Sequence, residues 1–213
     1  KGGGIYAYHS SLSLTDTVVE GNLLTAASGG YGGGLYLEGS DLLWNGGSLE
    51  GNSVTVDSDG YGGGIYATGT TISINMDTIS SNLVDAADLA EGGGIWTDSD
   101  AELLLNTLSQ NEVQARDAEF ELGGSGGGIL SAGGTLTLSV VEASQNFAGG
   151  VGGALAVLGG SLNLSSSTFS ENTAFWGGAL YQLDGMATLN NLLLYNNTAY
   201  DGGGAYWTES AGL

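Results

Sequence analysis

Four aspartates in the first half of the chain have a residue type and density that could serve a definite chemistry, the binding of Ca²⁺. Asp57 and Asp59 lie between Asn52 and the glycine cluster that begins at Gly62. Asp85 and Asp88 lie in the equivalent segment about thirty residues later, between Asn82 and Gly92. Calcium takes six to eight oxygen ligands, and carboxylates at this density could supply them. The spacing matches no known calcium motif, so a solvated acidic surface is the favoured interpretation and Ca²⁺ the alternative.

A second set of residues could form a binding surface. Tyr6, Tyr36, Tyr66 and Trp96 each follow an aliphatic residue that itself follows a glycine cluster. If the aliphatic residue faces a core, alternation along a strand puts the aromatic ring outside. The four rings are therefore predicted to form one solvent-facing ladder that binds a glycan or a partner protein. The alternative is that the rings only stack on one another and stabilise the sheet.

The chain shows no residues arranged for catalysis. His9 is the only histidine, there is no cysteine, and no nucleophile is paired with a base. A lyase acting on acidic sugars needs basic residues, and Lys1 and Arg116 are the only two. A glycoside hydrolase needs only two or three carboxylates, so it stays open as the alternative to a non-enzymatic protein. Apart from Ca²⁺, no cofactor is expected.

A regular repeat must position these residues. Glycine clusters recur along the whole chain, and an asparagine follows about twenty residues after each of the first seven. These asparagines are Asn22, Asn52, Asn82, Asn111, Asn146, Asn172 and Asn197. The segment from each asparagine to the next glycine cluster varies in length and is expected to be a loop. A repeat of 25 to 34 residues is typical of a solenoid.

Short alternating segments within each repeat predict the type of solenoid. Leu12-Ser13-Leu14 alternates, and Leu42 with Trp44 and Ile72 with Ile74 repeat the pattern. A period of two excludes a helical repeat. The prediction is an all-β fold, a single parallel β-helix over residues 1–213 with about 7–8 coils and three short strands per coil. Asparagines in register are expected to tolerate left-handed backbone and to hydrogen-bond from coil to coil.

Composition limits the partners. The net charge is −21, with 23 acids against two basic residues, so nucleic acid is excluded as a partner and anionic membranes are disfavoured. No apolar run of about 20 residues could span a membrane, so no direct membrane insertion is expected. The repeat runs unbroken from Lys1 to Leu213. We therefore expect a piece of a longer surface protein.

Three motifs resemble a known family. Gly152-Gly153-Ala154-Leu155 and Gly177-Gly178-Ala179-Leu180 match the GGA[ILV] motif of the polymorphic outer membrane proteins, and Phe169-Ser170-Glu171-Asn172 matches their FxxN motif. The likeness extends over the chain in degenerate form, since most repeats read GGG and only one has Phe before its asparagine. The resemblance implies a right-handed β-helix, carried at the cell surface as the passenger of an autotransporter and acting largely in adhesion.

The leading functional hypothesis is a non-enzymatic, extracellular structural or adhesive stalk that binds a protein or glycan at the cell surface. A self-assembling filament subunit is the second hypothesis, because an uncapped β-helix exposes strand edges that favour stacking.

Overall fold

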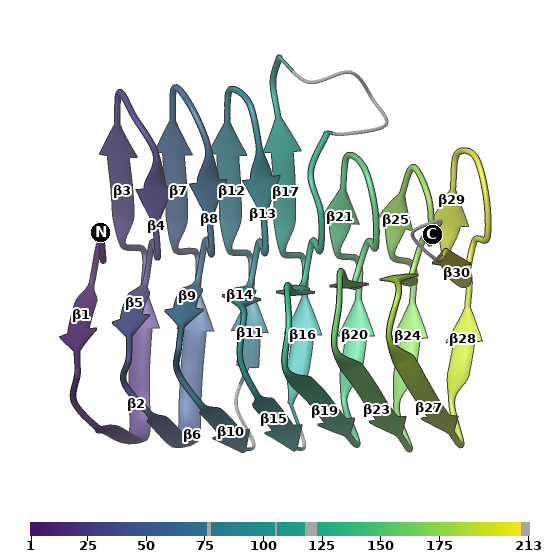
Figure 1. Cartoon of the computed structure of the whole chain (residues 1–213), viewed down its shortest axis with the longest axis horizontal. Coiled ribbons are helices and arrows are strands. Elements are labelled where there is room, and N and C mark those ends of the chain that lie inside the picture. Colours follow the sequence, from purple (N-terminus) through teal and green to yellow (C-terminus); the bar gives the residue numbers. More distant parts are fainter. Residues whose placement is uncertain (76–77, 105, 118–122, 210–213) are drawn as a thin grey trace.

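The computed structural model describes residues 1–75, 78–104, 106–117 and 123–209. Within them the chain forms strands, turns and bends, and no helix. The strands pair in parallel from coil to coil and run across an elongated rod (Figure 1). The predicted all-β fold, a parallel β-helix, is confirmed. None of the described residues belongs to a helix that could cross a membrane.

The first sheet collects the strand that follows each glycine cluster. Its eight strands, one from each successive coil, delimit seven turns of the solenoid. They are β1 (Ile5–Tyr8), β5 (Leu35–Glu38), β9 (Ile65–Thr68), β14 (Ile95–Thr97), β18 (Ile129–Ser131), β22 (Leu155–Val157), β26 (Leu180–Leu183) and β30 (Tyr206–Glu209).

The second sheet has twelve strands and covers two faces of the rod. In the first two coils one long strand crosses both faces, and from the fourth coil on two shorter strands do so. The strands are β2 (Leu12–Glu20), β6 (Leu42–Glu50), β10 (Ile72–Asn75), β11 (Thr78–Ser80), β15 (Ala101–Leu104), β16 (Thr107–Ser109), β19 (Thr135–Ser139), β20 (Glu142–Ser144), β23 (Ser161–Ser165), β24 (Thr168–Ser170), β27 (Met186–Asn190) and β28 (Leu193–Tyr195).

The segments after the asparagines, expected to be loops, contain two further sheets. The third sheet consists of β3 (Leu23–Ala26), β7 (Ser53–Val56), β12 (Leu83–Ala86), β17 (Glu112–Ala115), β21 (Phe147–Ala148), β25 (Thr173–Ala174) and β29 (Thr198–Ala199). The fourth consists of β4 (Gly30–Tyr31), β8 (Gly60–Tyr61) and β13 (Ala90–Glu91), and single bridges through Ser125, Val151 and Trp176 continue its row. The segments therefore keep a β backbone, and the strands of the third sheet shorten from four residues in the first four coils to two in the last three.

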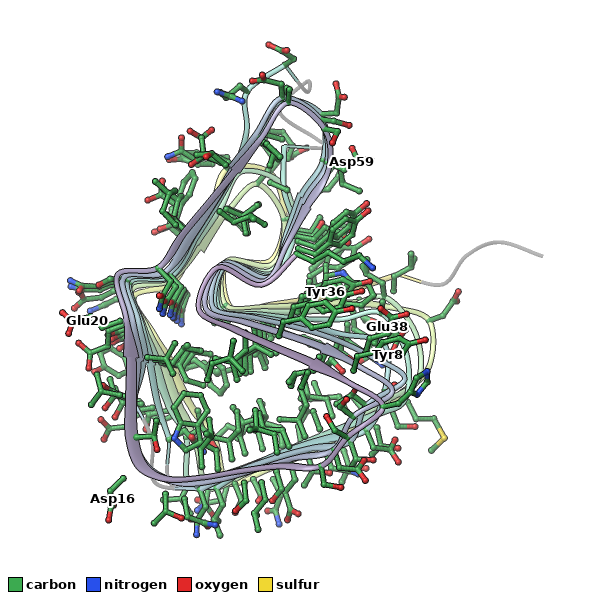
Figure 2. The ribbon with its side chains drawn as sticks, turned by 90° about the vertical axis from the view of Figure 1, so that its left-hand side faces the viewer. Tyr8, Asp16, Glu20, Tyr36, Glu38 and Asp59 are labelled. Carbon is green, nitrogen blue, oxygen red and sulfur yellow. The ribbon has the colours of Figure 1, made fainter. Side chains whose placement is uncertain are left out.

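The coil is right-handed. Figure 2 looks along the rod from the N-terminal end, and the first coil passes from Tyr8 on the right to Asp16 at the bottom and Glu20 on the left. The chain then passes over the top, where Asp59 marks the second coil, and returns to Tyr36 and Glu38 on the right. This path is clockwise while the chain moves away from the viewer, as the family resemblance implied.

Two hydrophobic cores run along the rod. The larger lies between the first and second sheets and includes Trp44, Phe169 and an aliphatic row from each strand, such as Leu35, Ile65 and Ile95. The smaller lies in the narrow arm formed by the third and fourth sheets, seen at the top of Figure 2. Its fully buried residues are all valine or alanine, small side chains that suit a thin core.

The seven asparagines form one continuous ladder at the corner between the two cores. Each Nδ2 of the first six donates to Oδ1 of the asparagine in the next coil at 2.8–3.0 Å. The backbone N–H of the same residue donates to the same oxygen. From Asn52 onward, Nδ2 also donates to a backbone carbonyl of the preceding coil, as Asn82 does to Leu49 at 2.9 Å. The buried amides are thus satisfied, which buried polar groups require.

The left-handed backbone conformation lies one residue before each asparagine, which corrects the expectation for the asparagines themselves. Ser81, for example, has φ 56° and Glu171 has φ 57°. The residue before each asparagine makes the turn, and the asparagine itself is needed for its side-chain amide. The full set is Gly21, Gly51, Ser81, Gln110, Gln145, Glu171 and Asn196.

Candidate partner-binding surface

Strand register places the predicted aromatic residues side by side. Tyr6 pairs with Tyr36 between β1 and β5, Tyr36 with Tyr66 between β5 and β9, and Tyr66 with Trp96 between β9 and β14. Adjacent rings are stacked, with centroids 5.2, 5.3 and 4.6 Å apart in that order. The four rings form one in-register row along the outer side of the first sheet.

A second row of tyrosines packs against the first from the fourth sheet. Tyr31 and Tyr61 pair between β4 and β8, and their rings stack at 5.2 Å. Each meets the first row edge to face: Tyr31 lies 5.0 Å from Tyr66, and Tyr61 lies 5.9 Å from Trp96. We call these six residues, Tyr6, Tyr36, Tyr66, Trp96, Tyr31 and Tyr61, the double aromatic row. The contact between the two rows was not predicted from the sequence, because alternation along one strand says nothing about a neighbouring sheet.

The prediction of a fully solvent-facing ladder is wrong for Tyr36. Its exposed fraction is 3%, whereas that of Tyr6 is 53%. Tyr6 and Tyr66 cover the two faces of the Tyr36 ring, and Tyr31 packs against it edge to face. Tyr66 and Trp96 are half-buried. The row therefore offers ring edges rather than the flat platform of ring faces that a sugar would stack upon.

The C-terminal half of the same surface is more aliphatic. A third cluster contains Leu130, Val151, Ala156 and Tyr181, with Trp96, Trp176 and Trp207 packed against it. In the last coil the inward position lies one residue further from the glycine cluster, because β30 pairs Tyr206 with Leu180 and Trp207 with Tyr181. Tyr206 consequently packs against the main core and Trp207 takes the outer position.

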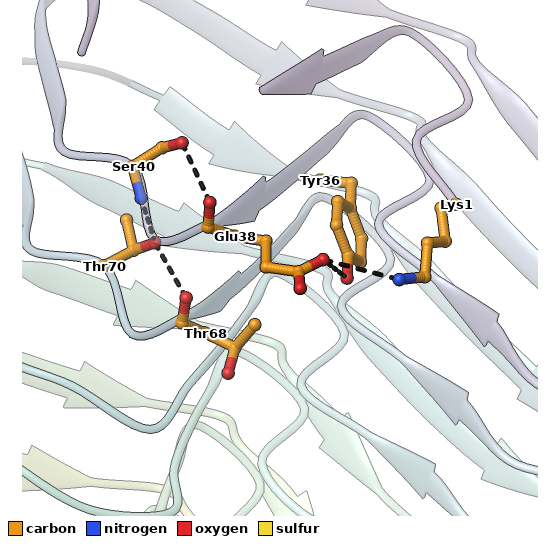
Figure 3. Close-up of polar contacts among 6 residues, drawn as sticks. All are labelled: Lys1, Tyr36, Glu38, Ser40, Thr68 and Thr70. Atoms are coloured by element: carbon orange, nitrogen blue, oxygen red, sulfur yellow. Dashed lines mark hydrogen bonds and ion pairs between the residues drawn. The ribbon is translucent and has the colours of Figure 1, made fainter. Parts of the chain in front are cut away.

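A charged group lies at the N-terminal end of the double aromatic row (Figure 3). The Tyr36 hydroxyl donates to Oε2 of Glu38 at 2.7 Å, and Nζ of Lys1 lies 3.4 Å from the same oxygen. Lys1 Nζ is also 4.8 Å from the centroid of the Tyr36 ring. The hydrogen bond from Tyr36 and the nearby ammonium of Lys1 lower the pKa of Glu38, so the carboxylate is ionised at neutral pH.

Glu91 is a second acid in this surface. It occupies the position of Tyr31 and Tyr61 in the fourth sheet, and the indole Nε1 of Trp96 donates to its Oε2 at 2.8 Å. Burial raises the pKa of Glu91, and the hydrogen bond from Trp96 opposes this only in part. Burial also raises the pKa of Tyr61 and of Tyr66 to about 12, which keeps both hydroxyls neutral.

The four aspartates proposed for Ca²⁺ do not gather into a metal site. Arg116, which follows β17, places its Nε 3.3 Å from Oδ1 of Asp85 and its Nη2 3.6 Å from Oδ1 of Asp57. Among the described residues no group of three or more acidic, histidine or cysteine side chains could hold a metal ion. The guanidinium of Arg116, from a later coil, therefore pairs with two of the proposed ligands, a contact that sequence spacing did not reveal.

A comparison with protein families supports the predicted resemblance. The model of the Chlamydia polymorphic membrane protein repeat matches residues 166–182. This segment holds β24 with Phe169, the ladder residue Asn172, and the glycines that precede Leu180 in β26. Searches of the curated proteins and of the solved structures gave no match.

Proposed function

We propose that this parallel β-helix, in which residues 166–182 match the polymorphic membrane protein repeat, is a surface-exposed, non-enzymatic stalk that binds a partner in adhesion. The observation that carries the proposal is the double aromatic row. Six rings are held in register on neighbouring strands, and a rigid set of rings loses little conformational entropy when it binds.

The position of these rings also supports a binding role. The larger core is already filled by aliphatic rows on the opposite side of β5, β9 and β14, so the fold does not need tyrosine on the outer side to close its interior. In inner coils Tyr66, Trp96, Tyr31 and Tyr61 are only half-buried, so part of each ring reaches the surface. Exposed apolar groups gathered on one surface commonly mark sites of protein interaction.

The test replaces Tyr66 and Trp96 together by serine and measures the binding of the protein to cells or to an array of glycans. The expected result is weakened binding with an unchanged β-sheet circular dichroism spectrum, because the core rows remain. A matched control replaces Leu43 and Leu104, two exposed apolar residues on the second sheet, by serine. Equal binding by both double variants and the wild type would overturn the proposal.

A further inference from the structure

One cationic group of the chain itself is bound at the end of the double aromatic row. Lys1 lies 3.4 Å from the Glu38 carboxylate and 4.8 Å from the centre of the Tyr36 ring. A carboxylate held in place by a tyrosine hydroxyl recognises ammonium groups through charge and a charge-assisted hydrogen bond. Because Tyr6 and Tyr66 cover both faces of the Tyr36 ring, the Glu38 carboxylate carries this recognition. The side chains of Lys1 and Glu38 are 51% and 35% exposed, so both stay accessible from solvent.

The acceptor half of this arrangement is built by the fold and does not depend on Lys1. Tyr36 and Glu38 are two residues apart on β5, so both side chains lie on the same side of the sheet. The Tyr36 hydroxyl holds the carboxylate at 2.7 Å, and the stacked rings of Tyr6 and Tyr66 hold Tyr36. Beyond β5, the Ser40 hydroxyl donates to the backbone carbonyl of Glu38 at 3.0 Å, which fixes the end of the strand (Figure 3).

We infer that Tyr36 and Glu38 form a binding site for primary ammonium groups, and that the partner of the double aromatic row is a cationic protein segment which inserts a lysine side chain in place of Lys1. This inference rests on the proposed function and specifies the chemistry of the partner. In the structure Lys1 occupies the site and competes with the incoming lysine.

Two further observations favour a cationic partner over a sugar. The stacked rings leave no gap between their faces for a sugar ring, since neighbouring centroids are only 4.6–5.3 Å apart. The chain also has 23 acids and only two basic residues, so attraction over a long range favours a positively charged segment.

The experiment compares the affinity of four forms of the protein for a lysine peptide, acetyl-Gly-Lys-Gly-amide, with the norleucine analogue as the neutral probe. The forms are the wild type, Lys1→Met, Glu38→Gln and Glu20→Gln. Glu20→Gln removes the same charge as Glu38→Gln but from the far side of the rod (Figure 2). Dissociation constants from NMR titration at low salt report binding.

The expected result is that Lys1→Met binds the lysine peptide several-fold more tightly than the wild type, because the competitor is gone. Glu38→Gln should bind it several-fold more weakly, and Glu20→Gln should match the wild type. Affinities that are equal in Lys1→Met and the wild type, or equal in the two glutamine variants, would overturn the inference. If lysine binding fails while the Tyr66→Ser, Trp96→Ser variant still loses adhesion, the proposed function stands and its partner is not cationic.

Discussion

Each inner asparagine of the ladder, from Asn52 to Asn172, makes contacts that no other side chain reproduces. Its Nδ2 bridges two coils and its Oδ1 accepts two donors from the coil before, as at Asn82. An aspartate lacks the donors, and an aliphatic residue lacks both functions. The ladder is therefore the feature of the sequence that specifies the coil most directly, and the sequence alone identified all seven members.

Replacing Asn82 by leucine should lower the free energy of unfolding by about 1–3 kcal/mol, because buried donors and acceptors in the neighbouring coils lose their partners. Asn82 is fully buried. Urea denaturation followed by circular dichroism measures the change. The half-buried Asn22 is the control, since its leucine variant should lose less. Equal losses at the two positions would contradict the importance of burial.

Glu91 should make stability depend on pH. Its pKa is raised in the folded state, so the folded protein binds the proton more tightly than the unfolded chain does. The stabilising contribution of the protonated form is present at low pH and is lost as the pH rises through the raised pKa. Glu91→Gln keeps an oxygen for the Trp96 indole without the charge, and it should raise the melting temperature at pH 7.

The gain from Glu91→Gln should disappear below about pH 4, where the wild-type side chain is itself protonated. Glu112→Gln serves as a control for the removal of one negative charge in a neighbouring coil. The melting temperatures of the wild type and the two variants at pH 4 and pH 7 test this prediction. A Glu91→Gln variant that is less stable than the wild type at pH 7 would show that the ionised carboxylate is needed.

At the scale of the strand and corner, the glycine clusters keep neighbouring coils in contact. A Cβ on Gly63 would lie 2.5 Å from the Gly93 carbonyl oxygen and 2.6 Å from that of Leu83, both backbone atoms of the next coil. Gly21 has the opposite situation, with φ +64° and no atom within 4 Å of the added Cβ. Glycine is therefore required at Gly63 because other backbone atoms approach closely, and at Gly21 only because the backbone is left-handed.

Gly63→Ala should consequently destabilise the protein by about 3 kcal/mol or more, because the coils must separate to admit the methyl group. Gly21→Ala should cost about 1–2 kcal/mol, the ordinary price of a left-handed alanine. Denaturant midpoints of the two variants give the comparison. If Gly21→Ala proves the more damaging change, the role assigned to the corner contact is wrong.

The strands that pack the larger core could be predicted because their pattern alternates and repeats in register. The third and fourth sheets were missed, since segments such as Leu23–Ala26 vary in overall length and their core is made of valine and alanine, which carry a weak signal. The burial of Tyr36 was missed for a different reason. Alternation gives the side of a strand, but what covers that side depends on the path of the fourth sheet.

At the scale of the whole molecule, the charge is spread along the coils and opposes their stacking. Glu20 and Glu50 face one another directly in the register of β2 and β6, and like charges in that position destabilise a sheet. Within the described residues, Lys1 and Arg116 make the only ion pairs, with Glu38, Asp57 and Asp85. Most of the −21 charge is thus left without a cation from the chain.

Sodium chloride should therefore raise the melting temperature, with most of the effect reached by about 0.5 M, where the screening length falls to a few ångströms. Differential scanning calorimetry from 10 mM to 1 M salt measures the trend. Glu50→Gln, which removes one of the two facing charges, should show a smaller rise. A melting temperature that falls as salt is added would mean that attractive pairs dominate the surface.

The direction of the hydrogen bonds has a mechanical consequence. The bonds of the sheets and of the asparagine ladder link each coil only to its neighbours along the rod, so a pull on the two ends loads them in series. The outermost coil should peel away first and leave the rest folded. Each event releases one repeat of chain, roughly 100 Å for thirty residues and about 85 Å for twenty-five. Under tension the protein would lengthen in steps and absorb work at each one, instead of failing all at once.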